Sequence, residues 1–388
     1  MEISFLGAAH EVGRSCFLVE GSQKILLDCG IKLGEKEEHP LLTKRDAAGL
    51  DKVVLSHAHL DHSGFTPALY ARGYSKKVFL TKPTRDLTQL LLADYLRLNK
   101  GEAAYGSSDV EKLLKHTQIM EYNEAFDGLR LQEAGHILGS AIVELELDGK
   151  KLVYTGDLNM RSSRLLDGAR TGLSADALII ESTYGLKNDK HVSTKEAGRI
   201  LIDSINETLR EGGRVIIPTF AIGRGQEILF TLESYIRSGG LEKVPIYVDG
   251  MINKVLRIYR HNAVYLKREV QRRILTSEED PFKSKHFLVP RTKDRRDVLA
   301  QEKAIIIATS GMLNGGPVLY YLEKLGEDER NKMILVGYQA NGTRGRALLD
   351  GEREIELGDE GKKIQVNLKV DQAPFNAHSD HNELMQFI

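Results

Sequence analysis

The chain has 388 residues, a formal net charge of −1 and 28% charged residues, which is the composition of a globular protein long enough for two domains. This near-neutrality argues mildly against a nucleic-acid partner, because affinity for phosphates follows local basic patches more than the total charge. Its two cysteines, Cys16 and Cys29, exclude a disulfide framework. We expect a reducing compartment and two core thiols, with a metal role as the alternative.

The N-terminus is predicted to begin with a strand at residues 2–6. Residues 1–9 lack the basic start and the extended apolar run of a signal peptide. No apolar run in the chain approaches the ~20 residues that cross a bilayer. We therefore expect a cytoplasmic protein with no membrane partner.

The first half of the chain is predicted to form two groups of strands separated by helices. The first strands are 17–20, 24–28, 52–56 and 78–81, with a hairpin at Gly21-Ser22. A helix follows at 83–98, and Ser108-x-x-Glu111 predicts a capping box for the next helix. Strands return at 129–133, 141–147, 151–154 and 177–181, with a turn at Asp148-Gly149. This order predicts an α/β sandwich of sheets with outer helices.

The second half alternates strand and helix. Ser193-x-x-Glu196 caps a long helix that ends near Gly212-Gly213. The strands that follow are predicted at 214–219, 245–248, 304–309 and 332–337, and the helices between them at 226–236, 253–259 and 317–325. Residues 291–296 are predicted to be a charged loop. Such alternation is typical of a parallel sheet built from βαβ units, which we place at about residues 185–375.

The strongest chemical signal is the loop His57-Ala58-His59-Leu60-Asp61-His62, directly after a predicted buried strand. Three of the twelve histidines fall in these six residues. Imidazole with carboxylate is a ligand set that suits zinc, with iron or manganese as alternatives. A polar loop with chance histidines is the competing interpretation.

One loop cannot complete two metal sites, and three further residues are candidates. His136 lies between two predicted strands in a glycine-flanked segment, and Asp157 ends a strand in Tyr-Thr-Gly-Asp. Asp28 also ends a strand, where a carboxylate suits the role of orienting a ligating histidine from behind. Turn capping is the alternative for Asp28.

These residues, in this order, resemble the metallo-β-lactamase superfamily. Further segments resemble the β-CASP nucleases within it: Glu181-Ser182-Thr183-Tyr184 is similar to motif A, and Phe375-Asn376-Ala377-His378-Ser379-Asp380 to motif B. Additional matching segments are residues 218–227 (PTFAIGRGQE), 309–313 (TSGML), 315–317 (GGP), 337–339 (GYQ) and 342–343 (GT). The likeness is strongest to the archaeal cleavage and polyadenylation specificity factor nuclease subunit, in a short form without the N-terminal RNA-binding extension, and weaker to RNase J and the DNA-processing branch.

The resemblance implies an α/β fold, namely a metallo-β-lactamase αββα sandwich with an inserted β-CASP α/β domain of mainly parallel sheet. The expected domains are residues 1–184, then 185–375 for the insertion, and 376–388 for the return to the first domain. It also implies a ligand set for two zinc ions, with Mn²⁺ or Fe²⁺ as alternatives. His57, His59 and His136 would hold one ion, Asp61 and His62 the other, and Asp157 both.

The implied activity is a zinc-dependent ribonuclease that hydrolyses RNA phosphodiester bonds as an endonuclease, with 5′–3′ exonuclease action as a further mode. Glu181 and His378 would form the proton-donating pair, with Asp61 counted among the catalytic residues. The alternative is that Glu181 is a surface residue and His378 a loop histidine. RNA, the expected partner, would lie between the domains. Its expected contacts are Gly223 and Arg224 at a helix start, and Arg344 and Arg346 in a glycine-rich loop.

One family feature is missing. No segment matches the Val-His-Gly-Glu-like motif C, so the second metal is one imidazole short of its relatives. We expect the native protein to continue for a few tens of residues and supply that histidine; substitution by His381, or one tight and one weak metal, is the alternative. Three other functions stay open: an inactive binding module, a hydrolase of small esters, and DNA processing. The sequence leaves open the preferred RNA and the choice between a homodimer and a larger RNA-processing complex.

Overall fold

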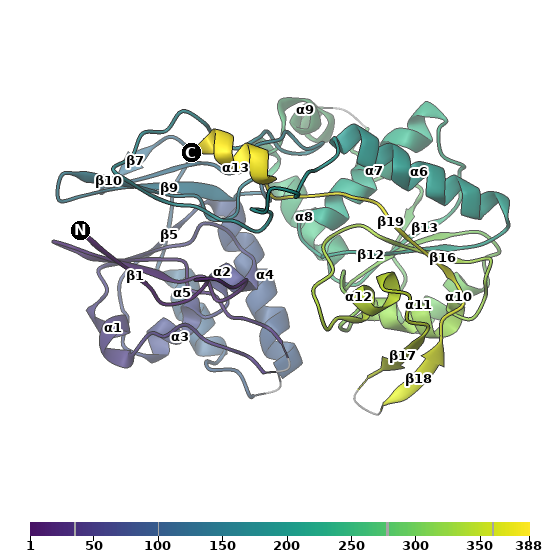
Figure 1. Ribbon diagram of the computed structural model, residues 1–388, viewed down its shortest axis with the longest axis horizontal. Helices are drawn as coiled ribbons and strands as arrows, with labels where there is room; N and C mark the ends of the chain where they lie inside the picture. Colours follow the sequence, from purple (N-terminus) through teal and green to yellow (C-terminus); the bar gives the residue numbers. More distant parts are fainter. Residues whose placement is uncertain (35, 100, 277–278, 359–360) are drawn as a thin grey trace. The chain divides into compact units, whose positions relative to one another are not determined.

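The computed structural model describes residues 1–34, 36–99, 101–276, 279–358 and 361–388. The chain forms two compact units (Figure 1). The first comprises Met1–Ser162, Leu166–Asp189 and His378–Ile388, and the second comprises Ser163–Leu165 and Lys190–Ala377. The α/β fold class with an inserted second body is therefore as predicted. The domain boundaries predicted from the sequence are residues 184 and 375. That prediction does not include the short segment 163–165, which belongs to the second unit.

The first unit contains two facing sheets. One has the order β1-β2-β3-β4-β5-β6 and is antiparallel from β1 to β3 and parallel from β3 to β6. Its strands are β1 (Glu2–Phe5), β2 (Phe17–Glu20), β3 (Lys24–Leu27), β4 (Lys52–Val54), β5 (Val78–Leu80) and β6 (Thr117–Ile119). The other has the order β11-β10-β9-β8-β7, in which only β10 and β11 are parallel. Its strands are β7 (Ala125–Phe126), β8 (Leu129–Glu133), β9 (Ala141–Leu147), β10 (Lys150–Tyr154) and β11 (Ala177–Ile179).

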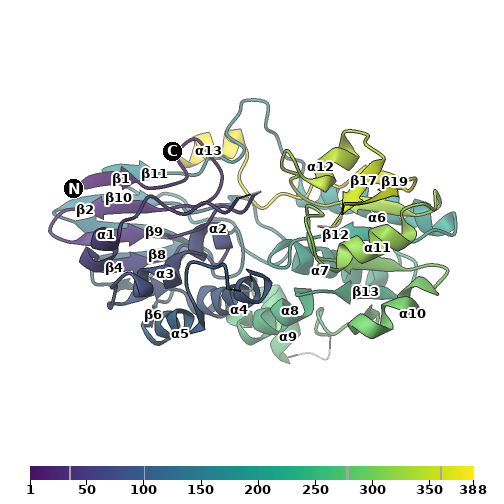
Figure 2. The same cartoon turned by 90° about the horizontal axis from the view of Figure 1, so that it is seen from below.

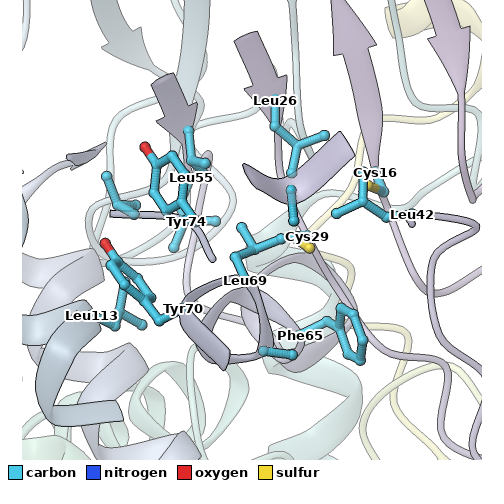
Figure 3. Packing of buried hydrophobic residues seen from close by; sticks show 14 of the residues in the cluster. Cys16, Leu26, Cys29, Leu42, Leu55, Phe65, Leu69, Tyr70, Tyr74 and Leu113 are labelled. Atoms are coloured by element: carbon cyan, nitrogen blue, oxygen red, sulfur yellow. The ribbon is translucent and has the colours of Figure 1, made fainter. Parts of the chain in front are cut away.

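The apolar strands explain the layering. Successive side chains of a strand point to opposite faces. Ile25 and Leu27 of β3 accordingly enter the core between the two sheets, whereas Leu26 enters the core beneath the outer helices (Figure 3). Those helices are α1 (Lys44–Gly49), α2 (Leu60–Ser63), α3 (Thr66–Ala71), α4 (Lys82–Asn99) and α5 (Ser107–Lys115).

The opposite face of the sandwich is covered by α13 (His381–Phe387) (Figures 1 and 2). Its Leu384 packs in a buried cluster with Ile142 of β9 and Val153 of β10. The C-terminal segment thus completes an αββα arrangement.

The predicted capping box at Ser108 is wrong in its position. Helix α5 begins at Ser107, two residues earlier than an N-cap at Ser108 implies, with Gly106 as its N-cap. The Gly106 N–H donates to the Asp109 carboxylate at 3.1 Å, and this contact decides where the helix starts. By contrast, the capping of α6 by Ser193 is confirmed: its side chain accepts from the Glu196 N–H at 3.1 Å.

The second unit has a sheet of order β14-β13-β15-β12-β16-β19, and its paired strands are all parallel. Its strands are β12 (Val215–Pro218), β13 (Ile246–Asp249), β14 (Phe287–Leu288), β15 (Ile305–Ala308), β16 (Lys332–Leu335) and β19 (Lys369–Gln372). An antiparallel pair that the sequence analysis does not predict, β17 (Glu354–Leu357) and β18 (Lys362–Gln365), lies between β16 and β19 in the chain.

Helices connect these strands. They are α6 (Thr194–Arg210), α7 (Arg224–Ser238), α8 (Ile252–His261), α9 (Arg268–Thr276), α10 (Arg295–Leu299), α11 (Pro317–Leu325) and α12 (Arg344–Leu349), with 3₁₀ turns at Ala263–Tyr265 and Thr292–Asp294. The predicted charged loop at 291–296 is therefore one 3₁₀ turn and the start of α10. An ion pair from Arg291 to Asp294 (2.5 Å) supports that turn. None of the helices in the described ranges has the length and apolar composition needed to cross a bilayer.

Candidate metal centre

The polar residues singled out in the first unit gather at one edge of its sandwich. Each follows a strand, lies in a connection between strands, or precedes a helix. Asp28 follows β3, the histidine loop 57–62 follows β4, His136 connects β8 to β9, Asp157 follows β10, Glu181 follows β11 and His378 precedes α13.

Backbone contacts hold the histidine loop beside the end of β3. The Cys29 N–H donates to the His62 carbonyl at 2.8 Å, and the Ile31 N–H donates to the Leu60 carbonyl at 2.9 Å. Between them lies Gly30, where an added Cβ would come within 1.7 Å of the Asp61 carbonyl oxygen. Only glycine allows this approach, so the sequence Asp-Cys-Gly sets the position of the ligand loop.

One group of four donors converges as a first metal position. His59 Nδ1 lies 3.2 Å from both His57 Nε2 and His136 Nε2, and Asp157 Oδ2 lies 3.5 Å from each of those two nitrogens. Tetrahedral zinc with bonds of about 2.0–2.1 Å requires donors roughly 3.3 Å apart. The spacing and the chemistry of these four atoms therefore fit one such ion.

A second group forms on the other side of Asp157. Its Oδ1 lies 3.3 Å from His62 Nε2, which in turn lies 3.8 Å from Asp61 Oδ2. The two oxygens of Asp157 thus face different donor sets, as a carboxylate shared by two ions requires. Three protein ligands are the usual number at a catalytic zinc. His381 belongs to none of the donor clusters found among the described residues, and its Nδ1 lies 2.8 Å from the Gly185 carbonyl oxygen.

Asp28 is fully buried behind the second group and contacts His62. Its Oδ2 accepts from His62 Nδ1 at 2.7 Å, which directs Nε2 of that ring toward Asp157. The same carboxylate accepts from the Ser56 N–H, the Ser56 hydroxyl and the Tyr154 hydroxyl at 2.6–2.7 Å. Sequence reasoning did not identify Ser56 or Tyr154. Their positions at strand ends next to a ligand loop were the only available signal.

Glu181 and His378 meet although 197 residues separate them in the chain. Both carboxylate oxygens lie 3.0 Å from His378 Nδ1. Glu181 is itself anchored by the Leu158 N–H at 2.7 Å, one residue after Asp157. The His378 ring lies 4.6 Å from the ring of His136. The pair is therefore next to the metal donors.

The electrostatics favour neutral imidazoles at His57 and His59 and a charged one at the acid pair. Burial, with repulsion from His62, lowers the pKa of His57 well below its usual range, and burial lowers that of His59. For His378, burial lowers the pKa, but the carboxylates of Glu181 and Asp157 outweigh burial and raise it to about 9. Without metal, His378 therefore carries a proton near neutral pH.

The four expected substrate contacts lie in the second unit, and their polar groups have partners there. Arg224 is buried and paired with Glu227 at 2.6 Å, and the Gly223 N–H donates to Gln226 at 2.8 Å. Arg344 donates to the Glu356 and Leu313 carbonyls, and Arg346 pairs with Asp350. A phosphate contact by Arg224 would require breaking a buried ion pair, and that role stays a prediction.

Two family models match the chain. The metallo-β-lactamase superfamily domain matches residues 17–183, and the β-CASP domain matches residues 225–348. Every donor of the two groups lies within the first of these matches, which agrees with the geometry described above. His378 lies outside both.

Similar proteins come from archaea. The transcription termination factor FttA of Methanothermobacter thermautotrophicus is 40% identical over the whole chain, which spans 64% of the length of that protein. An RNase J-like protein of Methanocaldococcus jannaschii is 41% identical, again over the whole chain, which covers 89% of that protein. A solved structure of an Enterococcus faecalis protein of unknown function has a TM-score of 0.59 with 12% identity, covering 99% of this chain and 90% of its own. That last likeness shows the fold alone.

Proposed function

The chain belongs to the β-CASP family of the metallo-β-lactamase superfamily, and from this premise we propose that it is a metal-dependent ribonuclease that hydrolyses RNA phosphodiester bonds. Two zinc ions are the proposed cofactors, with Mn²⁺ or Fe²⁺ as alternatives. The proposed ligands are His57, His59 and His136 for one ion, Asp61 and His62 for the other, and Asp157 for both. Glu181 and His378 are the proposed proton-donating pair.

The observation that carries this proposal is the placement of an acid pair beside two donor groups that share one carboxylate. Oxygen and nitrogen donors from Asp157, Glu181 and His378 lie within 4.8 Å of one another. Phosphodiester hydrolysis needs both features, because a nucleophile must attack phosphorus while the leaving ribose oxygen takes a proton. Neither feature alone would distinguish a nuclease from a protein that only binds metal.

When bound, two divalent cations here would lower the pKa of a water molecule toward neutrality and offset the charge on the phosphate. The residues of this chain supply the rest of the chemistry. Asp28 fixes the ring of His62 so that Nε2 serves as a ligand. Glu181 holds Nδ1 of His378, so Nε2 is the nitrogen that gives its proton to the leaving oxygen. The Glu181 carboxylate beside Nδ1 also favours the protonated ring, which is the form that can donate when attack begins.

RNA is proposed as the substrate because of the proteins that this chain is similar to. One of them is named RNase J-like, and the chain covers 89% of it. Identity does not separate the two kinds of relative, because FttA from the same Methanocaldococcus jannaschii is also 41% identical. We therefore propose hydrolysis of RNA for this chain. Transcription termination is not part of the proposal, because that name belongs to longer proteins of which this chain spans 64%.

The proposal is tested with the purified chain and labelled nucleic acid. The protein is stripped of metal with a chelator and reconstituted separately with zinc, manganese or iron(II). Each form is then incubated with RNA and DNA of one sequence, labelled at the 5′ or the 3′ end. We expect RNA cleavage that depends on added metal, with the products distinguishing internal cutting from stepwise removal of nucleotides. Metal-independent cleavage, or a reconstituted protein that cuts only DNA or neither substrate, would refute the proposal.

A further inference from the structure

Arg161 lies four residues after the shared carboxylate Asp157, in the loop that follows β10. Its guanidinium contacts the start of α13, the helix that begins three residues after His378. Nη2 donates to Asp380 Oδ2 at 2.8 Å, and Nε donates to Glu383 Oε1. The arginine side chain is 35% exposed, whereas the Asp380 and Glu383 side chains are 4% and 13% exposed. Arg161 therefore covers two nearly buried carboxylates.

Those two carboxylates are the capping box of α13. Asp380 Oδ1 accepts from the Glu383 N–H at 3.2 Å, and Glu383 Oε2 accepts from the Asp380 N–H at 3.0 Å. Each carboxylate thus uses one oxygen for the helix cap and the other for Arg161. Two carboxylates this close repel each other, and the guanidinium fork satisfies both geometrically in a way that lysine cannot.

The contact is the end of a short ladder between residues 158–161 and 378–383. The Ser379 N–H donates to the Leu158 carbonyl at 2.9 Å, and the Met160 N–H donates to the Ser379 hydroxyl at 2.9 Å. Ser379 is fully buried. One segment of this ladder directly follows Asp157, and the other begins at His378. The ladder therefore sets the position of the proton donor relative to the shared metal ligand.

We propose that Arg161 is a positioning residue that fixes His378 beside the metal centre by clamping the capping box of α13. The proposal rests on the proposed ribonuclease function. Arg161 touches no reacting atom, so its effect should appear only in steps that need the His378 proton. Misplacing a catalytic group by about 1 Å costs up to roughly 10²-fold in rate. We therefore expect Arg161→Ala to lower the rate of RNA cleavage by about 10–100-fold.

The leaving group distinguishes positioning from general damage to the fold. Cleavage of RNA expels a ribose alkoxide that needs a proton, whereas bis(p-nitrophenyl) phosphate expels a stabilised phenolate that does not. The R161A, R161K and H378A variants and the R161A/H378A double variant are assayed on both substrates, with zinc content measured for each. The control is R85A, which removes an arginine of similar exposure (29%) that contacts Thr117 and Asp86 elsewhere in the unit.

We expect R161A to lose RNA cleavage through kcat while nitrophenyl hydrolysis and zinc content stay within about twofold of wild type. R161K should recover part of the loss, and R161A should have no further effect once His378 is alanine. R85A should behave as wild type.

Three outcomes would overturn the positioning role. They are equal losses on both substrates, a loss that persists in the H378A background, and no loss at all. If the wild-type protein cleaves RNA and H378A shows the selective loss but R161A does not, only the Arg161 proposal fails. A wild-type protein that cuts no RNA refutes the proposed function, and the role of Arg161 with it.

Discussion

Replacing Asp28 with asparagine should weaken the second metal position without disturbing the backbone. Asp28 has a φ of +57°, which asparagine adopts as readily as aspartate, so the change introduces no backbone strain. It does change the hydrogen bonding. All four groups around the carboxylate present donors: the Ser56 N–H and hydroxyl, the Tyr154 hydroxyl and His62 Nδ1.

An amide cannot satisfy these donors. If its NH₂ replaces Oδ2, His62 Nδ1 must accept, and the ring proton moves to Nε2, which then cannot bind metal. If its NH₂ replaces Oδ1, it meets the Ser56 N–H, and a buried donor loses its partner. The first arrangement excludes the ligating form of His62, and the second keeps that form only by leaving the buried Ser56 N–H without its partner. Loss of such an orienting partner typically costs 10–100-fold in metal affinity, which corresponds to about 1.4–2.7 kcal/mol.

The assay is a zinc titration of the metal-free protein against a fluorescent chelator of known affinity. In D28N we expect the weaker of the two binding steps to lose about 10–100-fold in affinity and the tighter step to change by no more than about threefold. Tyr154→Phe is the matched control, because it removes one donor from the same oxygen and leaves the contact with His62. Wild-type affinity at both steps in D28N, or an equal loss in Y154F, would refute the reasoning.

Three further predictions concern the reaction and the stability of the first unit. His378→Ala should lower RNA turnover by about 10²–10⁴-fold with zinc content unchanged, and loss of zinc in this variant would instead make His378 a ligand. Asp157→Ala should lower turnover by about 10³-fold or more while circular dichroism stays native, since it removes the carboxylate that both donor groups share; near wild-type turnover with normal metal content would contradict that role. Burial, with repulsion from Asp167, raises the pKa of Glu133 to about 7 from 4.5. The folded protein then retains a proton that the unfolded chain releases, so this group lowers stability progressively as the pH rises from about 4.5 to 7. Glu133→Gln should therefore stabilise the protein by about 1–2 kcal/mol at pH 8, a value reduced for partial solvent access. The gain should be smaller at pH 5, because Glu133 in the folded protein still holds its proton there. Thermal unfolding at the two pH values tests this, and an equal gain at both would rule the charge out as the cause.

The proposed metal ligands could be named from the sequence because each follows a predicted strand or lies between two predicted strands. A histidine loop after one strand and an aspartate after another meet whenever those strands end at the same edge. The partners of the donors were harder to predict. Ser56 and Tyr154 act through hydroxyl groups that reach Asp28 from β4 and β10. No spacing in the sequence shows that these three positions become neighbours.

For the expected phosphate contacts, by contrast, the relevant neighbours lie close in the sequence. Arg224 and Arg346 lie at helix starts, where a basic residue suggests an anion site. Each has a carboxylate one helical turn onward, at Glu227 and Asp350, and in the structure it pairs with that carboxylate. Pairs at i,i+3 and i,i+4 form locally, before any substrate arrives. Phosphate would have to compete with these carboxylates, and contacts from either arginine stay a prediction.

The sequence separation of 197 positions between Glu181 and His378 also imposes an order on the synthesis of the protein. A ribosome produces every proposed metal ligand within the first 157 residues, and Glu181 soon after. The proton donor emerges only after the whole second unit has been translated. A chain that stops before residue 378 would therefore keep every proposed metal ligand and lack the proposed proton donor. Metal binding and RNA cleavage should accordingly separate at that point of the sequence.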